Sequence, residues 1–354
     1  MENRTTLWWG RFDPGYSRNR VLRGLLGDLG WRIRDFRPLL SRFAGAEASL
    51  RRIATPDLVW VPCFRQRDAA AAIAWARARG VPILFDPLIS AWDKQVFERE
   101  KFAEDSAEAW GLLAWEQGLF RQMDMVVADT VPHAEFFAQR FGLDMDRLAV
   151  IPVGAEESLF EPAPPDRTHQ GPVEVLFYGS FIGLQGPETI IEAAKLYDGP
   201  PVSWHLLGAG PLLADCQAAA QGLDNVVFEP WIDYKSLPAR IHDADILLGV
   251  FGASEKAGRV IPNKVYQALA CGRPVITRHS DAYPDDLNRP GSGIAFVPPG
   301  DAGALAQAVS HWASARDSLP DLSASAIASY GCYLSNAAIQ EHLRNALARL
   351  GFRD

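Results

Sequence analysis

The stretch "RVIPNKVYQALACGRPVIT", residues 259–277, indicates the fold because it joins a short helix directly to a buried strand. Pro262 is typical of a helix start and Gly272 of a helix end. The apolar run that follows Gly272 has the character of a strand covered on both faces. A helix that leads straight into such a strand is typical of α/β proteins with a parallel sheet.

The same alternation of strands and helices continues outward to both ends of the chain. Continuous apolar runs predict strands over residues 6–9, 32–37, 58–62, 82–85, 125–128, 149–153, 173–178, 203–207, 225–228, 246–250, 275–277 and 293–297. Helical patterns separate these runs, for example over residues 68–79, 103–122 and 132–141. The pattern therefore predicts parallel sheets that are covered by helices on both faces.

A length of 354 residues exceeds what one core usually supports and predicts two domains. Residues 157–172 contain four prolines and interrupt the alternation. We predict an N-terminal Rossmann-like domain over residues 1–160, a linker over 161–172 and a C-terminal Rossmann-like domain over 173–325. Residues 326–354 are predicted to be helical and could pack back on the first domain. Two such doubly wound sheets would face a cleft, and ligands would bind at the carboxyl ends of the strands.

The composition excludes several classes of protein. Hydrophobic residues make up 48% and charged residues 22%, which is an ordinary globular balance, and no apolar run reaches eighteen residues. The N-terminal residues lack the apolar stretch of a signal peptide, and the four cysteines have no metal-binding spacing. We therefore expect a cytoplasmic protein with reduced thiols, no metal or other cofactor, and no nucleic-acid partner.

Cations gather at the start of the helix in the opening stretch. Lys264 lies in its first turn, and Lys256 and Arg259 lie just upstream. Because a helix N-terminus is already partly positive, cations there favour a strongly anionic ligand such as a diphosphate. The alternative is that these lysines are solvated surface residues. The predicted donor site at this helix includes Lys256, Pro262, Asn263 and Gln267 as binding residues, with Lys264 and Arg259 as catalytic candidates.

Glycine turns follow other predicted strands of the second half. One turn begins at Gly179 and Ser180 and continues to Gln185, and another contains Gly208 and Gly210. Glycines at strand ends allow the backbone to approach a phosphate, although tight turns need glycine in any case. Three such elements at one end of a sheet indicate a phosphate-binding edge. Backbone groups near Trp231 and Ile232 are predicted to face the nucleotide base.

The first half carries a polar loop after its first strand and an acid after its fourth. The loop contributes the candidate binding residues Gly10, Arg11, Asp13, Gly15 and Tyr16. Asp86 would lie at a strand end and could bind an acceptor hydroxyl or transfer a proton. The alternatives are an ordinary solvated loop and a turn initiated by Asp-Pro. Glu116 is predicted to be an acid on a helix surface.

Positive charge is concentrated in the first half. Residues 4–67 hold thirteen arginines against five acids, a net charge of +8, although the whole chain carries −8. Within residues 31–52, arginines alternate with Trp31, Phe36, Leu39, Leu40 and Phe43. Such a surface can lie on an anionic bilayer, so we expect either peripheral contact with the inner face of the cell membrane or an ordinary core with solvated arginines.

The chain resembles the GT-B glycosyltransferases, and most of all the retaining family 4 group (glycosyl transferases group 1). The matching stretches are "VIPVGAEESLFEP", "VLFYGSFIGLQGPETIIEAAKLY", "LLGAGP", "NVVFEPWIDYKSLPARIHDADILL" and "VYQALACGRPVIT", within residues 150–277. The chain departs from the family at the E-x7-E pattern, where it has Arg259 and Gln267, and at the lysine of the "KG" element, where it has Gln185. Asp86 stands where the family usually has histidine.

The resemblance implies transfer of a sugar from a nucleotide diphosphate sugar to an acceptor, with retention and without a metal. Lys264, Arg259 and Lys256 would supply the charge that Gln185 lacks. The arginine-rich front favours a lipid-linked or polyanionic glycan acceptor, as in polysaccharide biosynthesis for the cell envelope. Two alternatives stay open: a non-catalytic partner of a glycosyltransferase, suggested by the missing glutamates, and a sugar-nucleotide epimerase of the same fold.

Overall fold

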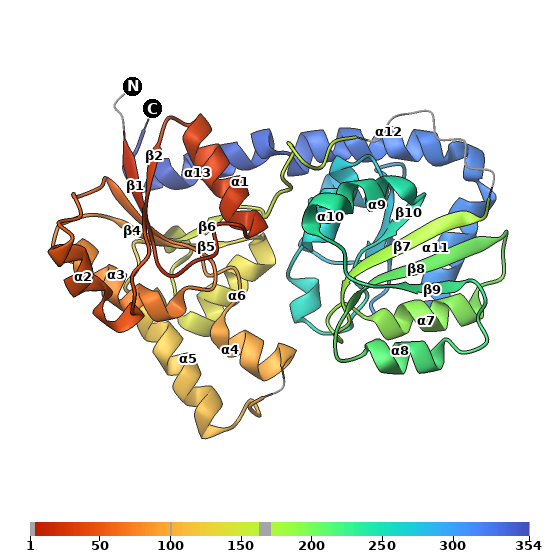
Figure 1. The fold of residues 1–354 in the computed structure, drawn as a ribbon, viewed down its shortest axis with the longest axis horizontal. Coiled ribbons are helices and arrows are strands. Elements are labelled where there is room, and N and C mark those ends of the chain that lie inside the picture. The colour runs from red at the N-terminus through yellow and green to blue at the C-terminus, as the bar shows by residue number, and fades with distance from the viewer. Residues whose placement is uncertain (1–3, 100, 163–170, 354) are drawn as a thin grey trace. The chain divides into compact units, whose positions relative to one another are not determined.

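The computed structural model describes residues 4–99, 101–162 and 171–353. The chain forms two compact units: unit 1 comprises residues 1–153 and 339–354, and unit 2 comprises residues 154–338. Most of the predicted linker, residues 163–170, lies outside the described residues. Figure 1 shows the elements of each unit in chain order.

Unit 1 contains a six-stranded parallel sheet in the order β2-β1-β3-β4-β5-β6. Its strands are β1 (Thr5–Trp9), β2 (Arg32–Phe36), β3 (Leu58–Val61), β4 (Ile83–Phe85), β5 (Met125–Ala128) and β6 (Leu148–Val150). Every residue of β3, β4 and β5 is buried, which explains why these strands are apolar without alternation. The order reverses between β1 and β3, so the topological switch point of this sheet lies there.

Helices cover both faces of this sheet (Figure 1). They are α1 (Ser17–Asp28), α2 (Ala44–Leu50), α3 (Gln66–Arg77), α4 (Ala91–Asp93), α5 (Ala107–Phe120), α6 (Val131–Phe141) and the last helix of the chain, α13 (Asn336–Arg349). Helix α6 begins at its cap Thr130, whose side chain accepts a hydrogen bond from the His133 N–H, and it ends at Gly142 in a left-handed conformation. Local capping residues therefore set the bounds of this helix.

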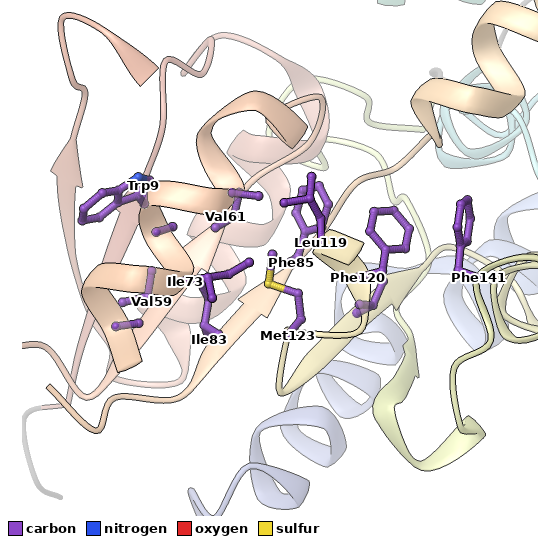
Figure 2. Close-up of a cluster of buried hydrophobic side chains, with 14 of the residues drawn as sticks. Trp9, Val59, Val61, Ile73, Ile83, Phe85, Leu119, Phe120, Met123 and Phe141 are labelled. Atoms are coloured by element: carbon purple, nitrogen blue, oxygen red, sulfur yellow. The ribbon is translucent and has the colours of Figure 1, made fainter. Parts of the chain in front are cut away.

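Two hydrophobic clusters lie on the two sides of the unit 1 sheet. Figure 2 shows one of them, in which Trp9, Val59 and Phe85 of the sheet pack with residues of α3, α5 and α6. The other joins Trp8 and Trp60 to α1 and to the buried residues of α13, which are Ile339, Leu343, Ala346 and Leu347. The core of unit 1 is therefore completed by residues from the far end of the chain.

Unit 2 repeats this architecture with the order β12-β11-β10-β7-β8-β9. Its strands are β7 (Val173–Ser180), β8 (Val202–Ala209), β9 (Val226–Glu229), β10 (Ile246–Leu248), β11 (Val275–Arg278) and β12 (Ile294–Val297). Its helices are α7 (Pro187–Leu196), α8 (Leu213–Ala219), α9 (Leu237–Asp243), α10 (Asn263–Ala270), α11 (Ala302–Ser314) and α12 (Leu319–Ser329). The predicted pair of doubly wound parallel sheets is confirmed. No helix among the described residues is long and apolar enough to span a bilayer.

Candidate functional site

The strand order of unit 2 reverses between β7 and β10, and the predicted donor residues gather at that point. The chain runs from β7 outward to β9 and then returns to β10 on the other side of β7. In open α/β sheets, ligands bind at the carboxyl ends of the strands beside such a reversal. Gly179 and Ser180 are the last two residues of β7, and the loop after β10 leads to helix α10, which carries Lys264.

Two glycines bring the ends of β7 and β8 into very close approach. Gly179 pairs with Gly208 in the parallel register, and both have φ near +150°. A Cβ atom at Gly208 would lie 1.9 Å from the carbonyl oxygen of Gly179, and one at Gly210 would lie 2.5 Å from that of Phe181. A side chain at Gly208 or Gly210 would therefore collide with the neighbouring backbone, so these two positions require glycine.

The side chain of Lys264 is buried at this edge among neutral groups. Its exposed fraction is 6%. Its Nζ donates a hydrogen bond of 2.7 Å to Oε1 of Gln185 and lies 3.8 Å from the ring centroid of Phe177. Burial lowers the pKa of the Lys264 ammonium well below its ordinary value. A buried cation whose partners here are neutral is suited to bind an anion.

The contact between Lys264 and Gln185 bears directly on the departure from the family pattern. Gln185 stands where the family has the lysine of its "KG" element, and Lys264 reaches the Gln185 side chain from helix α10. A Cβ atom at Gly179 would lie 2.4 Å from Oε1 of Gln185 and 3.0 Å from Nζ of Lys264. Both side chains therefore lie against the glycine turn that ends β7.

The remaining predicted cations lie close by in sequence, in and after the short 3₁₀ turn Lys256–Gly258. Lys256 is also only 6% exposed, so the alternative of solvated surface lysines is wrong for both Lys256 and Lys264. The side chain of Arg259 is 16% exposed and lies 3.9 Å from the exposed carboxylate of Glu255. Gln267 is buried, and its Oε1 accepts a hydrogen bond of 2.9 Å from the hydroxyl of Tyr178. Gln267 therefore orients α10 against β7.

Arg278 is a member of this site that the sequence interpretation missed. It ends β11 and is 8% exposed, and its guanidinium donates to the carbonyl oxygens of Gly252 and Ser254 at 2.6 and 2.9 Å. These bonds hold the loop between β10 and α10. Burial lowers the pKa of the Arg278 guanidinium. The position of Arg278 directly after an apolar run is the sequence feature that could have identified it.

The other predicted donor residues occupy the same end of the unit 2 sheet. Ser180 is exposed at the end of β7, and Trp231 and Ile232 follow β9, where Trp231 is 59% exposed. Pro262 is the N-cap of α10 in an extended conformation, and Asn263 is its first residue. The first N–H groups of a helix have no partner within the helix, so this end can accept an anion.

In unit 1, the predicted front loop lies at the other switch point, between β1 and β3. Gly10 has φ +136°, and the N–H of Arg11 donates to Oδ2 of Asp68 at 3.1 Å. Oδ1 of Asp13 accepts from the N–H of Gly15 at 2.8 Å. Tyr16 packs edge-on against Phe64 from the loop after β3, with ring centroids 5.1 Å apart. The loop is thus a folded turn rather than an open excursion.

Asp86 lies directly after β4 as predicted, but its carboxylate is not open to solvent. It is 1% exposed, and Nε of Arg18 donates to its Oδ2 at 2.7 Å. Arg18 also donates to the carbonyl oxygens of Ile151 and Pro152 beyond β6. Burial raises the pKa of the Asp86 carboxyl, although Arg18 acts in the opposite direction. The catalytic role of Asp86 stays a prediction, and its visible role is to hold Arg18.

Glu116 is not a surface acid, and that prediction is wrong. Its side chain is fully buried, and it accepts hydrogen bonds from the hydroxyl of Ser90 and from the N–H groups of Ala91 and Trp92. These three bonds satisfy the start of α4, which a periodicity argument on α5 alone does not reveal. Burial raises the pKa of the Glu116 carboxyl.

The arginine-rich segment divides into core and surface. Trp31 and Phe36 are buried, so their assignment as membrane anchors is wrong. The exposed fractions of Leu39, Leu40 and Phe43 are 74%, 57% and 58%. Leu50, which ends α2, is 84% exposed. Four exposed arginines accompany them, namely Arg37, Arg42, Arg51 and Arg52. We call these eight residues the apolar-basic patch.

Each unit matches a known protein family. Residues 10–154 match the family described as "Glycosyl transferase 4-like domain", and residues 172–314 match "Glycosyl transferases group 1". The two matches together leave only residues 1–9, 155–171 and 315–354 uncovered. Every strand of the two sheets except β1 is therefore inside the matched ranges.

Curated relatives match over part of their length. The chain is 27% identical over 191 residues to a D-inositol 3-phosphate glycosyltransferase of Xylanimonas cellulosilytica, covering 49% of this chain and 44% of that protein. It is 33% identical over 114 residues to a putative colanic acid biosynthesis glycosyl transferase, WcaI, of Escherichia coli, covering 31% of this chain and 27% of that protein. The matched region thus spans less than half of each relative.

Solved structures show the same fold over nearly the whole chain. Anabaena Alr3699/HepE in complex with UDP superposes with a TM-score of 0.71 at 15% identity, covering 98% of this chain and 99% of that one. A sucrose-phosphate synthase from Thermosynechococcus elongatus superposes with a TM-score of 0.72 at 19% identity, covering 99% of each chain. The predicted pair of Rossmann-like domains is thereby also found in these proteins.

Proposed function

Because both of its units match their family models, the chain belongs to the group 1 glycosyltransferases of GT-B fold, and we propose that it transfers a sugar from a nucleotide diphosphate sugar to an acceptor. Unit 2 would bind the donor and unit 1 the acceptor. The single observation that carries the proposal is the buried Lys264 at the switch point of unit 2, against the glycine turn that ends β7.

The chemistry of the switch point fits a diphosphate. Lys264 contributes a cation, α10 contributes its N-terminal N–H groups, and the missing side chain of Gly179 leaves room for Nζ of Lys264 beside the strand end. A diphosphate that replaced Gln185 as the partner of Nζ would turn a neutral contact into a charge-assisted one. We propose UDP as the first nucleotide to test, because HepE was solved in complex with UDP and with UDP-glucose.

The same groups would assist the reaction itself. As the acceptor oxygen forms a bond to the anomeric carbon, the bond from that carbon to the β-phosphate oxygen breaks, and the proton of the acceptor hydroxyl passes to the departing phosphate oxygen. Negative charge then grows on the departing nucleoside diphosphate, so a fixed cation stabilises the transition state more than the ground state. We propose that the transfer retains the anomeric configuration and needs no bound metal, as the family resemblance implies.

The donor proposal is tested by a thermal-shift panel of nucleoside diphosphates on the full chain. Binding raises the melting temperature by mass action. Lys264→Gln should weaken UDP binding about tenfold to a hundredfold, because a charge-assisted contact contributes about 1.5–3 kcal/mol. Lys195→Gln is the matched control, since Lys195 is an exposed lysine of unit 2 paired with Glu192. EDTA should leave UDP binding unchanged. Equal UDP affinity in wild type and Lys264→Gln would contradict the proposal.

Turnover separates catalysis from the non-catalytic alternative. A glycosyltransferase should release nucleoside diphosphate from its donor only in the presence of acceptor, and product NMR should show the donor's anomeric configuration. A pseudo-enzyme would bind the nucleotide without releasing it. An epimerase would change the donor without any acceptor.

We also propose that the apolar-basic patch of unit 1 rests on an anionic membrane. Leu39 and Leu50 are more than 70% exposed beside exposed arginines, and exposed leucines are stabilised when they enter the interfacial region of a bilayer. The arginines would attract anionic headgroups. A membrane position is consistent with an envelope acceptor that is lipid-linked or polyanionic.

Vesicle co-sedimentation tests the membrane proposal. At low salt the protein should sediment with vesicles that contain phosphatidylglycerol and not with neutral vesicles. Leu39→Glu combined with Leu50→Glu should abolish sedimentation, because it places acids in the contact. Val131→Glu is the control, since Val131 is also exposed but lies outside the patch. Sedimentation that survives the double substitution would exclude this surface as the contact.

A further inference from the structure

A second pocket lies in unit 1, in the loops that follow β3 and β4. Its volume is about 490 Å³, which is within the range typical of small-molecule sites. It is lined by Phe64, Arg65, Gln66, Arg67, Ala91, Gln95, Arg99, Lys101, Phe102, Leu112 and Trp115. We call it the basic pocket. Its place at the carboxyl ends of parallel strands is where ligands of such sheets bind.

All charged residues that line the basic pocket are cations. Four of the eleven lining residues are cations, namely Arg65, Arg67, Arg99 and Lys101, and none is an acid. Arg65 is held by Asp68, whose Oδ2 lies 2.7 Å from its Nε, whereas Arg67 and Arg99 are exposed. Glu116, next to Trp115 on α5, accepts hydrogen bonds from the N–H groups at the start of α4 and is not among the lining residues. The pocket is therefore suited to an oxyanion.

The neutral part of the lining consists of three aromatic residues, two glutamines, an alanine and a leucine. Phe64, Phe102 and Trp115 offer flat aromatic surface next to the cations. Trp115 is 40% exposed, and the ring of Phe64 is 36% exposed and has Nζ of Lys94 at 5.4 Å. Aromatic faces carry negative potential that attracts the weakly positive C–H groups of a sugar ring. Flat surfaces beside cations thus fit a sugar that also bears an acid group.

The backbone around the pocket is strained. Phe64 has φ +62° and Leu88 has φ +58°, although neither residue is glycine. They lie in the loops after β3 and β4, and the N–H of Phe64 donates to the carbonyl oxygen of Pro87 at 3.2 Å. Strain of this kind persists only where surrounding structure enforces it, and it is concentrated at ligand sites. Here it holds the Phe64 ring at the pocket.

We propose that the basic pocket binds the oxyanion-bearing sugar of the acceptor, through a phosphate or a carboxylate on that sugar. This inference rests on the proposed function, because it names the chemistry of the acceptor that unit 1 would hold. Arg67 and Arg99 bind the oxyanion, and Trp115 contacts the sugar ring.

Titration calorimetry on the full chain tests this assignment with four probes: glucose 6-phosphate, glucuronic acid, glucose and inorganic phosphate. The two anionic sugars should bind at least about tenfold more tightly than glucose or phosphate. Glucose lacks the oxyanion that the arginines would bind, and phosphate lacks the sugar ring that Trp115 would contact. Arg67→Gln combined with Arg99→Gln, and separately Trp115→Ala, should weaken the anionic sugars by about tenfold or more. Arg32→Gln, an exposed arginine of β2, should leave binding unchanged.

Several outcomes would overturn the assignment. Failure of both anionic sugars to bind at millimolar concentration would do so, as would an equal loss of binding in Arg32→Gln. If the Arg67/Arg99 variant instead lost binding to phosphatidylglycerol vesicles while no free sugar bound, the oxyanion would be a lipid headgroup rather than a sugar. The UDP thermal shift is measured in wild type and in every variant. If UDP does not shift the melting temperature of the wild type, the donor proposal is contradicted. If UDP shifts it but no anionic sugar binds, only the assignment of the basic pocket is contradicted.

Discussion

The most informative residue is Lys264, whose location was predictable and whose environment was not. The sequence places it at a helix start near glycine turns, which is sufficient to predict an anion site. It cannot show that Nζ is buried on the Phe177 ring and bonded to Gln185, because these partners lie 79 or more residues away in the chain. A buried ammonium with neutral partners destabilises the fold, since the unfolded chain solvates the same charge in water.

We therefore predict that Lys264→Met stabilises the ligand-free protein while it weakens nucleotide binding. The expected rise in the free energy of unfolding is about 1–2 kcal/mol near neutral pH, by analogy with other buried charges replaced by apolar side chains. The sign with pH follows from the lowered pKa of Lys264 in the fold. As the pH rises from that pKa towards about 10.4, the folded amine is neutral before the unfolded one, so wild-type stability rises.

Urea unfolding of wild type and Lys264→Met across alkaline pH measures both effects. The advantage of the methionine variant should shrink as the pH rises through this window, because the wild-type penalty disappears there. A methionine variant that is less stable at neutral pH would show that contacts within the protein already compensate the buried charge.

Asp86 and Glu116 show why acids are harder to assign than strands. The position of Asp86 follows from the end of β4, but its partner Arg18 lies 68 residues earlier. Glu116 has the spacing of a surface residue, and only the fold shows that it satisfies the first N–H groups of α4. Both environments depend on tertiary contacts that a local pattern does not contain.

At the scale of elements, every strand was predictable within a few residues of its ends. Strands of a parallel sheet are covered on both faces, so they are apolar runs that stand out between amphipathic helices. The helix bounds were less accurate: α5 was predicted over residues 103–122 and extends over Ala107–Phe120. Its cap Ser106, which accepts a hydrogen bond from Ala109, explains the later start.

Gly208 provides a test of the glycine edge in unit 2. Gly208→Ala should lower the free energy of unfolding by about 3 kcal/mol, because the residue has φ +147° and its new Cβ would overlap the Gly179 carbonyl. Gly24→Ala is the matched control: Gly24 lies in α1 with no atom within 4 Å of a Cβ, and alanine there should stabilise by about 0.5–1 kcal/mol. Thermal unfolding measures both, and a neutral Gly208→Ala would mean that this edge relaxes freely.

At the scale of the molecule, the sequence predicted two doubly wound sheets because length and alternation both demand them. It also predicted that the helical segment 326–354 could pack back on the first domain, and the residues from Ile339 onward do belong to unit 1. Helix α13 is amphipathic like many surface helices, and nothing in its own pattern specifies Trp8 and Leu22 as the residues it covers. The residues against which a helix packs are determined by shape and apolar area rather than by the spacing of residues along the helix.

The dependence of unit 1 on α13 has a consequence for the order in which the protein matures during synthesis. Its sheet leaves the ribosome first, yet Ile339 and Leu343 arrive only after all of unit 2 has been translated. At about 5–20 residues per second, translation of unit 2 takes on the order of 10 to 40 seconds. During that time the apolar surface of unit 1 that α13 will cover stays exposed. The unit whose sheet is made first is thus the last to be completed.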